Sequence, residues 1–287
     1  MARKEADADQ NTDNPQEETM NVPKNRYITI IEDIFRRHYK RGMREFVFER
    51  REIEDVAQRL GMKLPKNLGD LIYSFRYRAE LPDSITSKAP SGQHWVIRSV
   101  GRSKYQFALS NQSRISPNPA LAVIKILDAT PGMIERYALN DEQALLAKLR
   151  YNRLIDIFMG VACYSLQNHL RTTAPGIGQA EVDEIYVGVD RHGAQYVFPV
   201  QAKGGRDQIS VVQIEQDIAV CKHRFSGLIC RPIAAQFMAE NVIALFELIE
   251  TNGEVVVVAE RHYQLVSPED LGDEELQSYA STRRIDE

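Results

Sequence analysis

The sequence has few cysteines and no long apolar run, and each of these features excludes classes of protein. Its three cysteines, Cys163, Cys221 and Cys230, belong to no Cys-x-x-Cys or histidine-rich group, which argues against a structural zinc site or a disulfide framework. No apolar stretch reaches the roughly 18 residues of a membrane span, and the N-terminus lacks the apolar core of a signal peptide. We therefore expect a soluble, cytoplasmic protein with reduced thiols and no membrane contact.

Several glycine-containing catalytic and nucleotide-binding motifs are also missing. The sequence has no G-x-x-x-x-G-K-S/T, and no G-x-G-x-x-G or G-x-S-x-G in a suitable context. Nucleotide hydrolysis, dinucleotide binding and serine-hydrolase chemistry therefore have no support.

Charge is distributed unevenly along the 287 residues, although the net charge is only −4. Residues 1–23 have a net charge of −4, residues 24–114 carry 19 basic and 10 acidic side chains, and residues 115–287 carry 15 basic and 24 acidic side chains. A basic front half joined to an acidic back half is typical of a nucleic-acid reader coupled to a carboxylate metal site. Ordinary variation between two domains gives the same division, so the charge supports this interpretation without establishing it.

Residues 179–205 have the pattern of a β-hairpin. β-forming residues alternate along the first arm, and an Asp-Arg-His-Gly turn supplies the positive φ that a tight reversal needs. Because side chains repeat every two residues along a strand, Glu181 and Asp183 project from one face, as do Gln201 and Lys203. The hairpin therefore brings two acids, an amide and an ammonium group to one end.

This arrangement resembles the PD-(D/E)xK nuclease superfamily, which has the restriction-endonuclease-like fold. In that pattern an acid on one strand is followed, after a hairpin, by acid-x-Lys on the next strand, and the matching residues are Asp183, Gln201 and Lys203. The resemblance covers roughly residues 139–265. It departs from the family at Gln201, where the family usually has Asp or Glu; an amide oxygen is a hard-cation ligand that brings no charge.

The resemblance implies a role for each of these residues. Asp183, Glu181 and the Gln201 oxygen are expected to hold Mg²⁺, with Mn²⁺ as the alternative, while Lys203 positions or deprotonates the attacking water and neutralises charge on the phosphate. Glu142 matches an acid that the first helix of the family often contributes, although a glutamate in a first helical turn is also favoured by the helix dipole. The alternative is an edge hairpin with a solvated polar face and a surface lysine.

Residues 24–114 resemble a winged-helix domain. The pattern gives a helix, a short strand, a second helix, a tight turn, a third helix and a two-stranded wing at residues 94–98 and 105–109. In such a domain the third helix commonly enters the major groove and the wing contacts the DNA backbone. Winged helices also serve as protein-docking modules, which leaves these side chains as ordinary solvated charges. The residues expected to contact DNA are Lys66, Asn67, Ser74, Arg76, Arg78, Arg98, Arg102 and Lys104.

The remaining patterns predict a restriction-endonuclease-like three-layer α/β/α core within residues 139–270. The polar segment at residues 161–178 is expected to approach the acidic strand, with Arg171 or Thr172 able to contact phosphate. Gln213 is the residue of the following helix that best matches a site glutamine in some branches of the superfamily; Gln216 and Asp217 share its helix face. The expected elements are a helix capped by Asn140, the hairpin, a helix at 208–224, a strand at 228–237, a helix at 240–249 and a strand from Glu254.

Three segments are expected to lie outside the two domains. Residues 1–23 are acidic and almost free of apolar side chains, so we expect a disordered tail. Residues 115–138 contain two prolines near their start and are expected to form a linker. Residues 271–287 are acidic and are expected to be a frayed C-terminal tail.

These patterns support two hypotheses of function. The first is a Mg²⁺-dependent DNA endonuclease, of restriction or defence type, that acts on double-stranded DNA, with a companion methyltransferase as a further partner. Since both strands must be cut by one core per chain, this hypothesis implies a homodimer or two successive nicks. The second is a non-catalytic winged-helix DNA-binding or regulatory protein whose nuclease domain has degenerated, with Gln201 as the trace.

Overall fold

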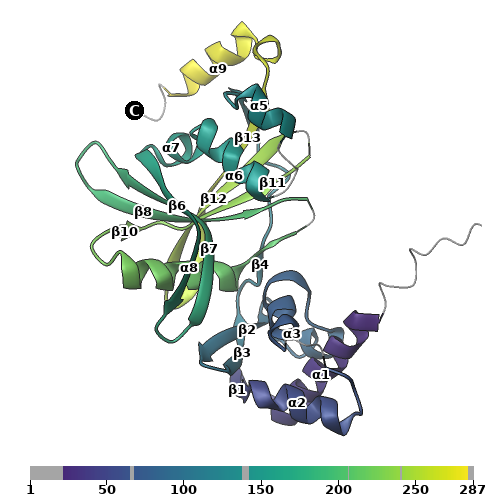
Figure 1. Cartoon of the computed structure of the whole chain (residues 1–287). Helices are drawn as coiled ribbons and strands as arrows, with labels where there is room; N and C mark the ends of the chain where they lie inside the picture. The colour runs from purple at the N-terminus through teal and green to yellow at the C-terminus, as the bar shows by residue number, and fades with distance from the viewer. Residues whose placement is uncertain (1–21, 65–67, 138–141, 206, 240, 284–287) are drawn as a thin grey trace, which may run out of the picture.

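The computed structural model has two domains and describes five stretches of the chain (Figure 1). Residues 1–21 of the predicted tail, the predicted DNA contacts Lys66 and Asn67, and the predicted helix cap Asn140 lie outside these stretches. No helix within them is long and apolar enough to cross a membrane. The described residues are 22–64, 68–137, 142–205, 207–239 and 241–283.

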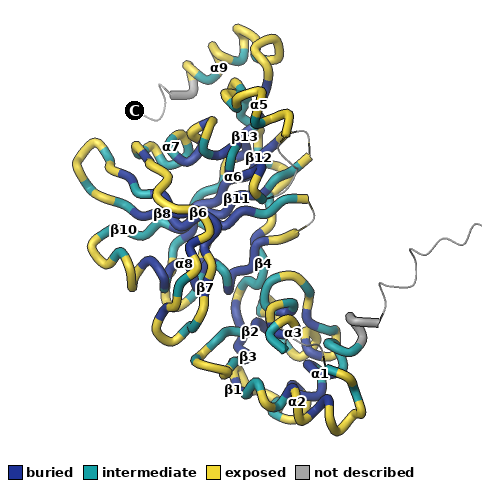
Figure 2. The backbone as a smooth tube through the Cα atoms, in the orientation of Figure 1, coloured by how far each residue is buried: buried dark blue, intermediate teal, exposed yellow. Residues whose placement is uncertain are grey.

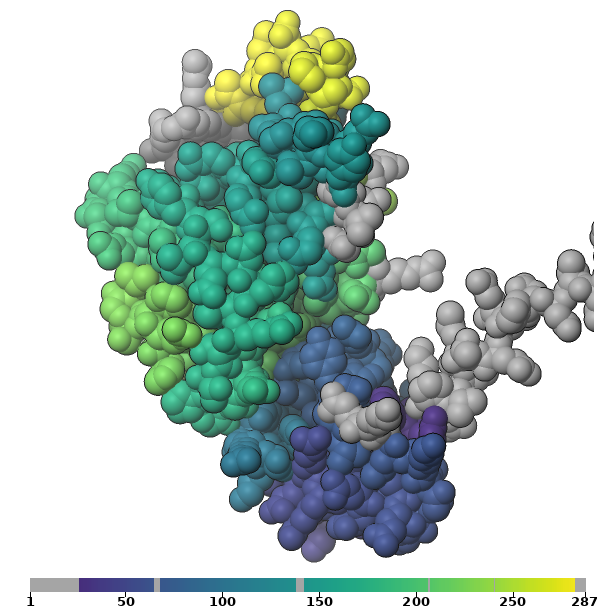
Figure 3. Space-filling model, in the orientation of Figure 1, coloured from purple at the N-terminus to yellow at the C-terminus, as the bar shows by residue number. Residues whose placement is uncertain are grey.

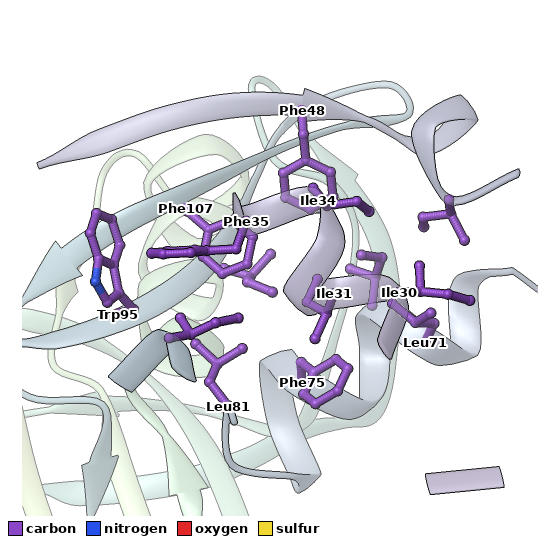
Figure 4. Close-up of a cluster of buried hydrophobic side chains, with 14 of the residues drawn as sticks. Ile30, Ile31, Ile34, Phe35, Phe48, Leu71, Phe75, Leu81, Trp95 and Phe107 are labelled. Carbon is purple, nitrogen blue, oxygen red and sulfur yellow. The ribbon is translucent and has the colours of Figure 1, made fainter. Parts of the chain in front are cut away.

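The N-terminal domain packs helices α1 to α4 and the π-helical turn η1 against a three-stranded antiparallel sheet of order β1-β3-β2. Its core is aromatic and aliphatic: the stripe Ile30, Ile31, Ile34 and Phe35 of α1 meets the sheet at the fully buried Phe107 (Figure 4). The predicted wing is confirmed as the β2–β3 hairpin, and β1 completes the sheet. The elements are α1 (Val22–His38), β1 (Glu45–Glu49), α2 (Arg50–Arg59), α3 (Gly69–Tyr73), η1 (Ser74–Arg78), α4 (Asp83–Thr86), β2 (His94–Gly101) and β3 (Lys104–Ser110).

The predicted third helix is short and changes its winding. It begins as α3 and continues directly as η1, a single π-helical turn. Leu71, Ile72 and Phe75 are buried, whereas Tyr73 and Arg78 are exposed. π-Helical turns are rare and are frequently found at functional sites.

The C-terminal domain is built on an eight-stranded mixed sheet of order β5-β13-β12-β11-β8-β7-β6, with β10 pairing β8. β8 and β11 are parallel, so the chain between them must cross over, and α8 (Val211–Arg224) makes this connection. The strands are β5 (Val123–Leu127), β6 (Ala162–Ala174), β7 (Gly178–Val189), β8 (Gln195–Lys203), β10 (Ile229–Cys230), β11 (Ile233–Phe237), β12 (Val242–Thr251) and β13 (Glu254–Val266).

Helices cover both faces of this sheet, and the central strands are buried between them (Figure 2). On one face, Leu145 and Leu149 of α6 (Glu142–Tyr151) and Ile155 of α7 (Leu154–Met159) pack on the sheet. On the other face, Ile214 and Ile218 of α8 pack on it. The domain is therefore mixed α/β with a large sheet between helices.

Two segments predicted to lie outside the domains belong to the structure instead. The predicted linker contains α5 (Gly132–Tyr137) and β5, which extends the large sheet by parallel pairing with β13. The predicted frayed tail forms α9 (Asp273–Arg283), which follows the short η2 (Pro268–Asp270). Lys125 of β5 joins the two: its Nζ lies 3.0 Å from Glu275 Oε1, and its backbone N–H donates to Tyr279 Oη at 3.0 Å.

One further prediction in the C-terminal domain was wrong: residues 242–249, predicted as part of a helix, belong to strand β12, which is buried on both sides. The polar segment predicted to approach the acidic strand does lie beside it, mostly as strand β6, paired antiparallel with β7. The first helix ends before α7, because Arg153 adopts a left-handed conformation with φ of 51° and separates α6 from α7.

Polar contacts join the domains along the start of α8, where the space-filling view shows the N-terminal domain against the sheet domain (Figure 3). β4 (Arg114–Ile115) pairs with β9 (Ile209–Ser210), immediately before α8. Arg98 of β2 forms two hydrogen bonds of 2.7 and 2.6 Å with Glu215 of α8. Ser210 Oγ donates to the backbone oxygen of Arg76 at 2.8 Å. The junction therefore fixes η1 beside α8.

Candidate active site

The β7–β8 hairpin positions the central carboxylate of the site. The predicted hairpin is confirmed, with Gly193 at φ of 84° in its turn. The β7–β8 pairing ends at Glu184 and Val200. Beyond this pair the Asp183 side chain replaces the backbone as acceptor, and its Oδ2 accepts the Ala202 backbone N–H at 2.9 Å. Asp183 is thereby held at the open end of the hairpin.

Asp183 is costly to ionise in this position. It is only 8% exposed, and burial raises its pKa to about 6. The Ala202 N–H and the Lys203 ammonium lower this pKa, whereas the negative charge of Glu142 raises it. Burial therefore outweighs the positive charge that Lys203 brings to Asp183, and a bound cation would favour the ionised form of Asp183.

Lys203 and Glu142 form an ion pair next to Asp183. Glu142 begins α6, and its Oε1 lies 2.5 Å from Lys203 Nζ. The lysine side chain is 13% exposed and that of Glu142 is 38% exposed. The structure therefore brings together the predicted lysine and the acid predicted from the first helix.

Gln201 lies deeper than the other members of the predicted motif and is only 1% exposed. Its Nε2 donates to the Glu181 backbone oxygen at 3.1 Å and to Asp217 Oδ1 at 3.2 Å. Its Oε1 lies 3.5 Å from Gln213 Nε2. The amide is thus oriented by an acid of α8, and the predicted neighbour Gln213 does reach it.

Asp217 is a buried acid to which the sequence analysis assigns no function. It is fully buried, and its Oδ2 has no hydrogen-bond partner among the described residues. Burial, and after it the charge of Asp183, raises the pKa of Asp217 well above its usual value. Its helix position four residues after Gln213, on the polar face of α8, is the sequence feature that points toward the site.

Glu181 contacts β6 through both carboxylate oxygens. Oε1 lies 3.3 Å from His169 Nδ1, and Oε2 lies 3.1 Å from Arg171 Nε. The Glu181 carboxylate, a predicted metal ligand, is thus engaged by side chains of β6, whereas the charge of Glu142 acts directly on the pKa of Asp183.

These groups line a cleft of about 700 Å³ between the two domains. Asp183, Lys203 and Glu142 lie on its sheet-domain side, and η1 supplies Arg76 and Arg78 from the N-terminal domain. The residues of the cleft that the sequence analysis does not single out are Tyr73, Tyr77, His169, Thr173, Gln179, Ala180 and Asp207.

The tyrosines and arginines of α3 and η1 pack against one another within the cleft. The Arg78 guanidinium lies 5.0 Å from the ring centre of Tyr73, and that of Arg76 lies 4.7 Å from the ring of Tyr77. The two tyrosine rings meet edge to face at 4.9 Å. Nε and Nη2 of Arg76 are buried and have no hydrogen-bond partner in the described part of the chain.

The other predicted DNA contacts lie apart from the cleft lining. Arg98 is engaged by Glu215 at the domain junction, so its charge is already compensated. Arg102 and Lys104 are exposed at the turn of the β2–β3 hairpin. Ser74 is half-buried at the start of η1.

The oxygen donors around Asp183 are of the kind that hold a hard cation. No group of three or more His, Cys, Asp or Glu side chains suited to a metal occurs among the described residues. Two carboxylates, Asp183 and Glu142, do interact electrostatically, and Gln201 directly precedes Ala202, whose backbone N–H donates to Asp183. Oxygen donors of this kind suit Mg²⁺, which usually takes only one or two protein carboxylates and retains waters.

Comparison of the chain with protein-family models, with curated proteins and with solved structures finds no match.

Proposed function

We propose that this protein is a metal-dependent DNA endonuclease of the PD-(D/E)xK, restriction-endonuclease-like type. The observation that carries the proposal is the joint cleft: Asp183, Glu142 and Lys203 lie on one side of it, and Arg76 and Arg78 of the N-terminal domain lie on the other. Carboxylates beside a lysine suit phosphodiester hydrolysis, and arginines suit the binding of the polyanionic substrate.

The residues of the chain have separable roles in this proposal. Asp183, Glu142 and the Gln201 oxygen would hold the cation, and Asp217 would orient the Gln201 amide. The bound cation would supply an activated water and offset charge on the phosphate. Lys203, recessed at 13% exposure, would orient the water and neutralise charge that develops on the phosphate oxygens.

The fold supports the same proposal at a coarser level. The order of helix, three antiparallel strands, crossover helix and parallel strand places the hairpin in the middle of a sheet that is covered on both faces. The domain before it, with helices and a β-hairpin wing, is of the kind expected for a winged helix. With one core per chain, cleavage of both strands of a duplex would need a homodimer or two successive nicks.

One feature favours the second candidate function, a DNA-binding regulator without catalysis. Gln201 brings no charge, and its donors are already taken by Glu181 and Asp217. If the site holds no cation, the cleft still offers Arg76 and Arg78 to a phosphate backbone.

The test is incubation of the purified protein with supercoiled plasmid and with mixed-sequence linear DNA, in Mg²⁺, Mn²⁺ or EDTA. We expect metal-dependent cutting that is abolished in Lys203→Met and Asp183→Ala, with DNA binding in EDTA retained by both. The matched control is Lys88→Met, because Lys88 is an exposed lysine outside the cleft and outside the predicted DNA contacts. Binding without cutting under every metal would favour the regulator, and intact cutting by Asp183→Ala would reject the assigned site.

A further inference from the structure

The groups proposed to act on phosphate lie inside the cleft between the domains. Asp183 and Lys203 are recessed there, at 8% and 13% exposure. A phosphate within a stacked, paired duplex therefore approaches these groups less readily than a phosphate in an unpaired strand.

Contacts at the junction between the domains hold the two walls of the cleft in place. Arg98 and Glu215 form two charge-assisted hydrogen bonds, and Tyr77 Oη donates to Gln216 Oε1 at 2.5 Å. Arg114 Nη1 also donates to the Tyr77 backbone oxygen at 2.7 Å. Because these contacts tie β2 and η1 to the sheet domain, widening the cleft requires breaking them.

The wall contributed by the end of α3 and by η1 has the chemistry of a base-stacking platform. Tyr73 is 46% exposed although it lies in a cleft. The Arg78 guanidinium lies over its ring, and Tyr77 supports it edge to face. Aromatic side chains interleaved with arginines bind single strands without base preference, because every base has a π-face and every linkage has a charge.

The Arg76 side chain indicates where the phosphates would lie. Its Nε and Nη2 are buried without a hydrogen-bond partner among the described residues, and its guanidinium packs on Tyr77. An anion in the cleft would compensate this charge, and the cleft also contains the hydroxyl groups of Thr172 and Thr173. The positive wall and the aromatic platform thus belong to one helix, opposite Asp183.

We propose that the cleft binds an unpaired DNA strand, with a base stacked on Tyr73 and its phosphates between the η1 arginines and Lys203. This inference deepens the proposed function and rests on it for the cutting step alone. It specifies single strands, flaps or extruded nucleotides as the substrates, in place of an intact duplex.

Binding in EDTA tests the inference separately from catalysis. Fluorescence anisotropy would measure the Kd of the full-length protein for a labelled single strand, for the same sequence as a blunt duplex, and for that duplex with a single-stranded flap. We expect the single strand and the flap to bind at least about tenfold more tightly than the duplex. Equal or tighter binding of the blunt duplex would overturn the proposal.

Variants at Tyr73 make the test specific. Tyr73→Ala is expected to raise the Kd for the single strand about 5- to 100-fold, and Tyr73→Phe, which keeps the ring, to stay within about twofold of the native protein. Tyr164→Ala is the matched control, since Tyr164 is 63% exposed on β6 and does not line the cleft. Thermal melting confirms that each variant is folded.

The outcomes separate the two proposals. Binding of the single strand that depends on Tyr73, without cutting in any metal, would support this inference and reject the nuclease. Cutting of intact duplex that is unchanged in Tyr73→Ala would reject this inference and support the nuclease. Unchanged single-strand affinity in a folded Tyr73→Ala variant would also reject it.

Discussion

Replacing Asp183 with asparagine should stabilise the protein at neutral pH while destroying its proposed activity. In the native chain the carboxylate is buried at 8% exposure, and its pKa is raised to about 6. Asparagine has the same shape, is neutral at every pH, and keeps an oxygen that accepts the Ala202 N–H. The substitution therefore removes a buried charge without leaving a cavity.

The sign and size follow from the difference between the folded and unfolded states. The folded-state pKa of about 6 exceeds the ordinary value of 3.8, so the folded state holds the proton more tightly. The resulting stabilisation is complete below pH 3.8 and is lost as the pH rises through 6. The difference of about two pKa units corresponds to about 3 kcal/mol. Asp183→Asn should thus match the native protein near pH 4 and exceed it by up to about 3 kcal/mol above pH 7.

Urea unfolding between pH 4 and pH 8, in EDTA, measures this difference as a free energy of unfolding at each pH. Asp190→Asn is the control of opposite sign. Partial burial opposes ionisation of Asp190, but hydrogen bonds from the His192 and Ala194 backbone N–H groups hold its pKa below the usual value. Removing the Asp190 carboxylate should lower the free energy of unfolding at pH values above the ordinary pKa of aspartate and change it little in acid.

Addition of Mg²⁺ supplies the second half of the test. A cation at Asp183 binds the folded state and favours the ionised carboxylate, so it should raise the melting temperature of the native protein and leave Asp183→Asn unchanged. Equal stability of the native and Asp183→Asn proteins across the whole pH range would refute the reasoning from burial. An equal Mg²⁺ shift in both proteins would place the cation elsewhere.

Two further predictions concern the surroundings of the cleft. Gln201→Glu replaces the 3.2 Å hydrogen bond to buried Asp217 with a second carboxyl group and should lower the free energy of unfolding by about 3 kcal/mol. Adding Asp217→Asn should restore most of this loss. Equal losses in the single and double variants would contradict an interaction between residues 201 and 217. Arg98→Ala leaves Glu215 unpaired at the domain junction and should cost about 1–2 kcal/mol in urea unfolding. The exposed Arg102→Ala should cost nothing measurable, and an equal loss in both arginine variants would exclude a role for the junction.

The hairpin could be predicted because its information is local. Alternation along residues 179–205 sets which side chains share a face, and a glycine-containing turn sets the register. The positions of Asp183 and Lys203 follow directly from that register. The nearness of Glu142 could be anticipated only from the resemblance to a known family, because it depends on how α6 packs against the sheet.

The errors arise where burial hides the strand period. β12 is buried continuously from Val242 to Leu248, so its apolar run does not alternate, and its alanine, leucine and glutamate residues favour a helix. β6 has the reverse problem: only Cys163, Leu170 and Ala174 are buried along this edge strand, too few for any period to be visible. Strand β5, which lies in the predicted linker, is also hard to recognise from the sequence, since it is short and its partner in the sheet is the distant strand β13.

The association of the two domains around the cleft has a consequence for how DNA is recognised. A recognition helix that enters the major groove by itself needs a free face, but the backbone of η1 accepts hydrogen bonds from Ser210 and Arg114. The tyrosines and arginines of α3 and η1 also line the cleft that contains Asp183. This helix cannot both lie in a groove distant from the proposed cleavage site and form a wall of the proposed catalytic cleft. The exposed Arg102 and Lys104 at the tip of the β2–β3 hairpin remain available for flanking duplex. The contacts of η1 are therefore expected to affect cutting and binding together, whereas those of the hairpin tip should affect binding alone.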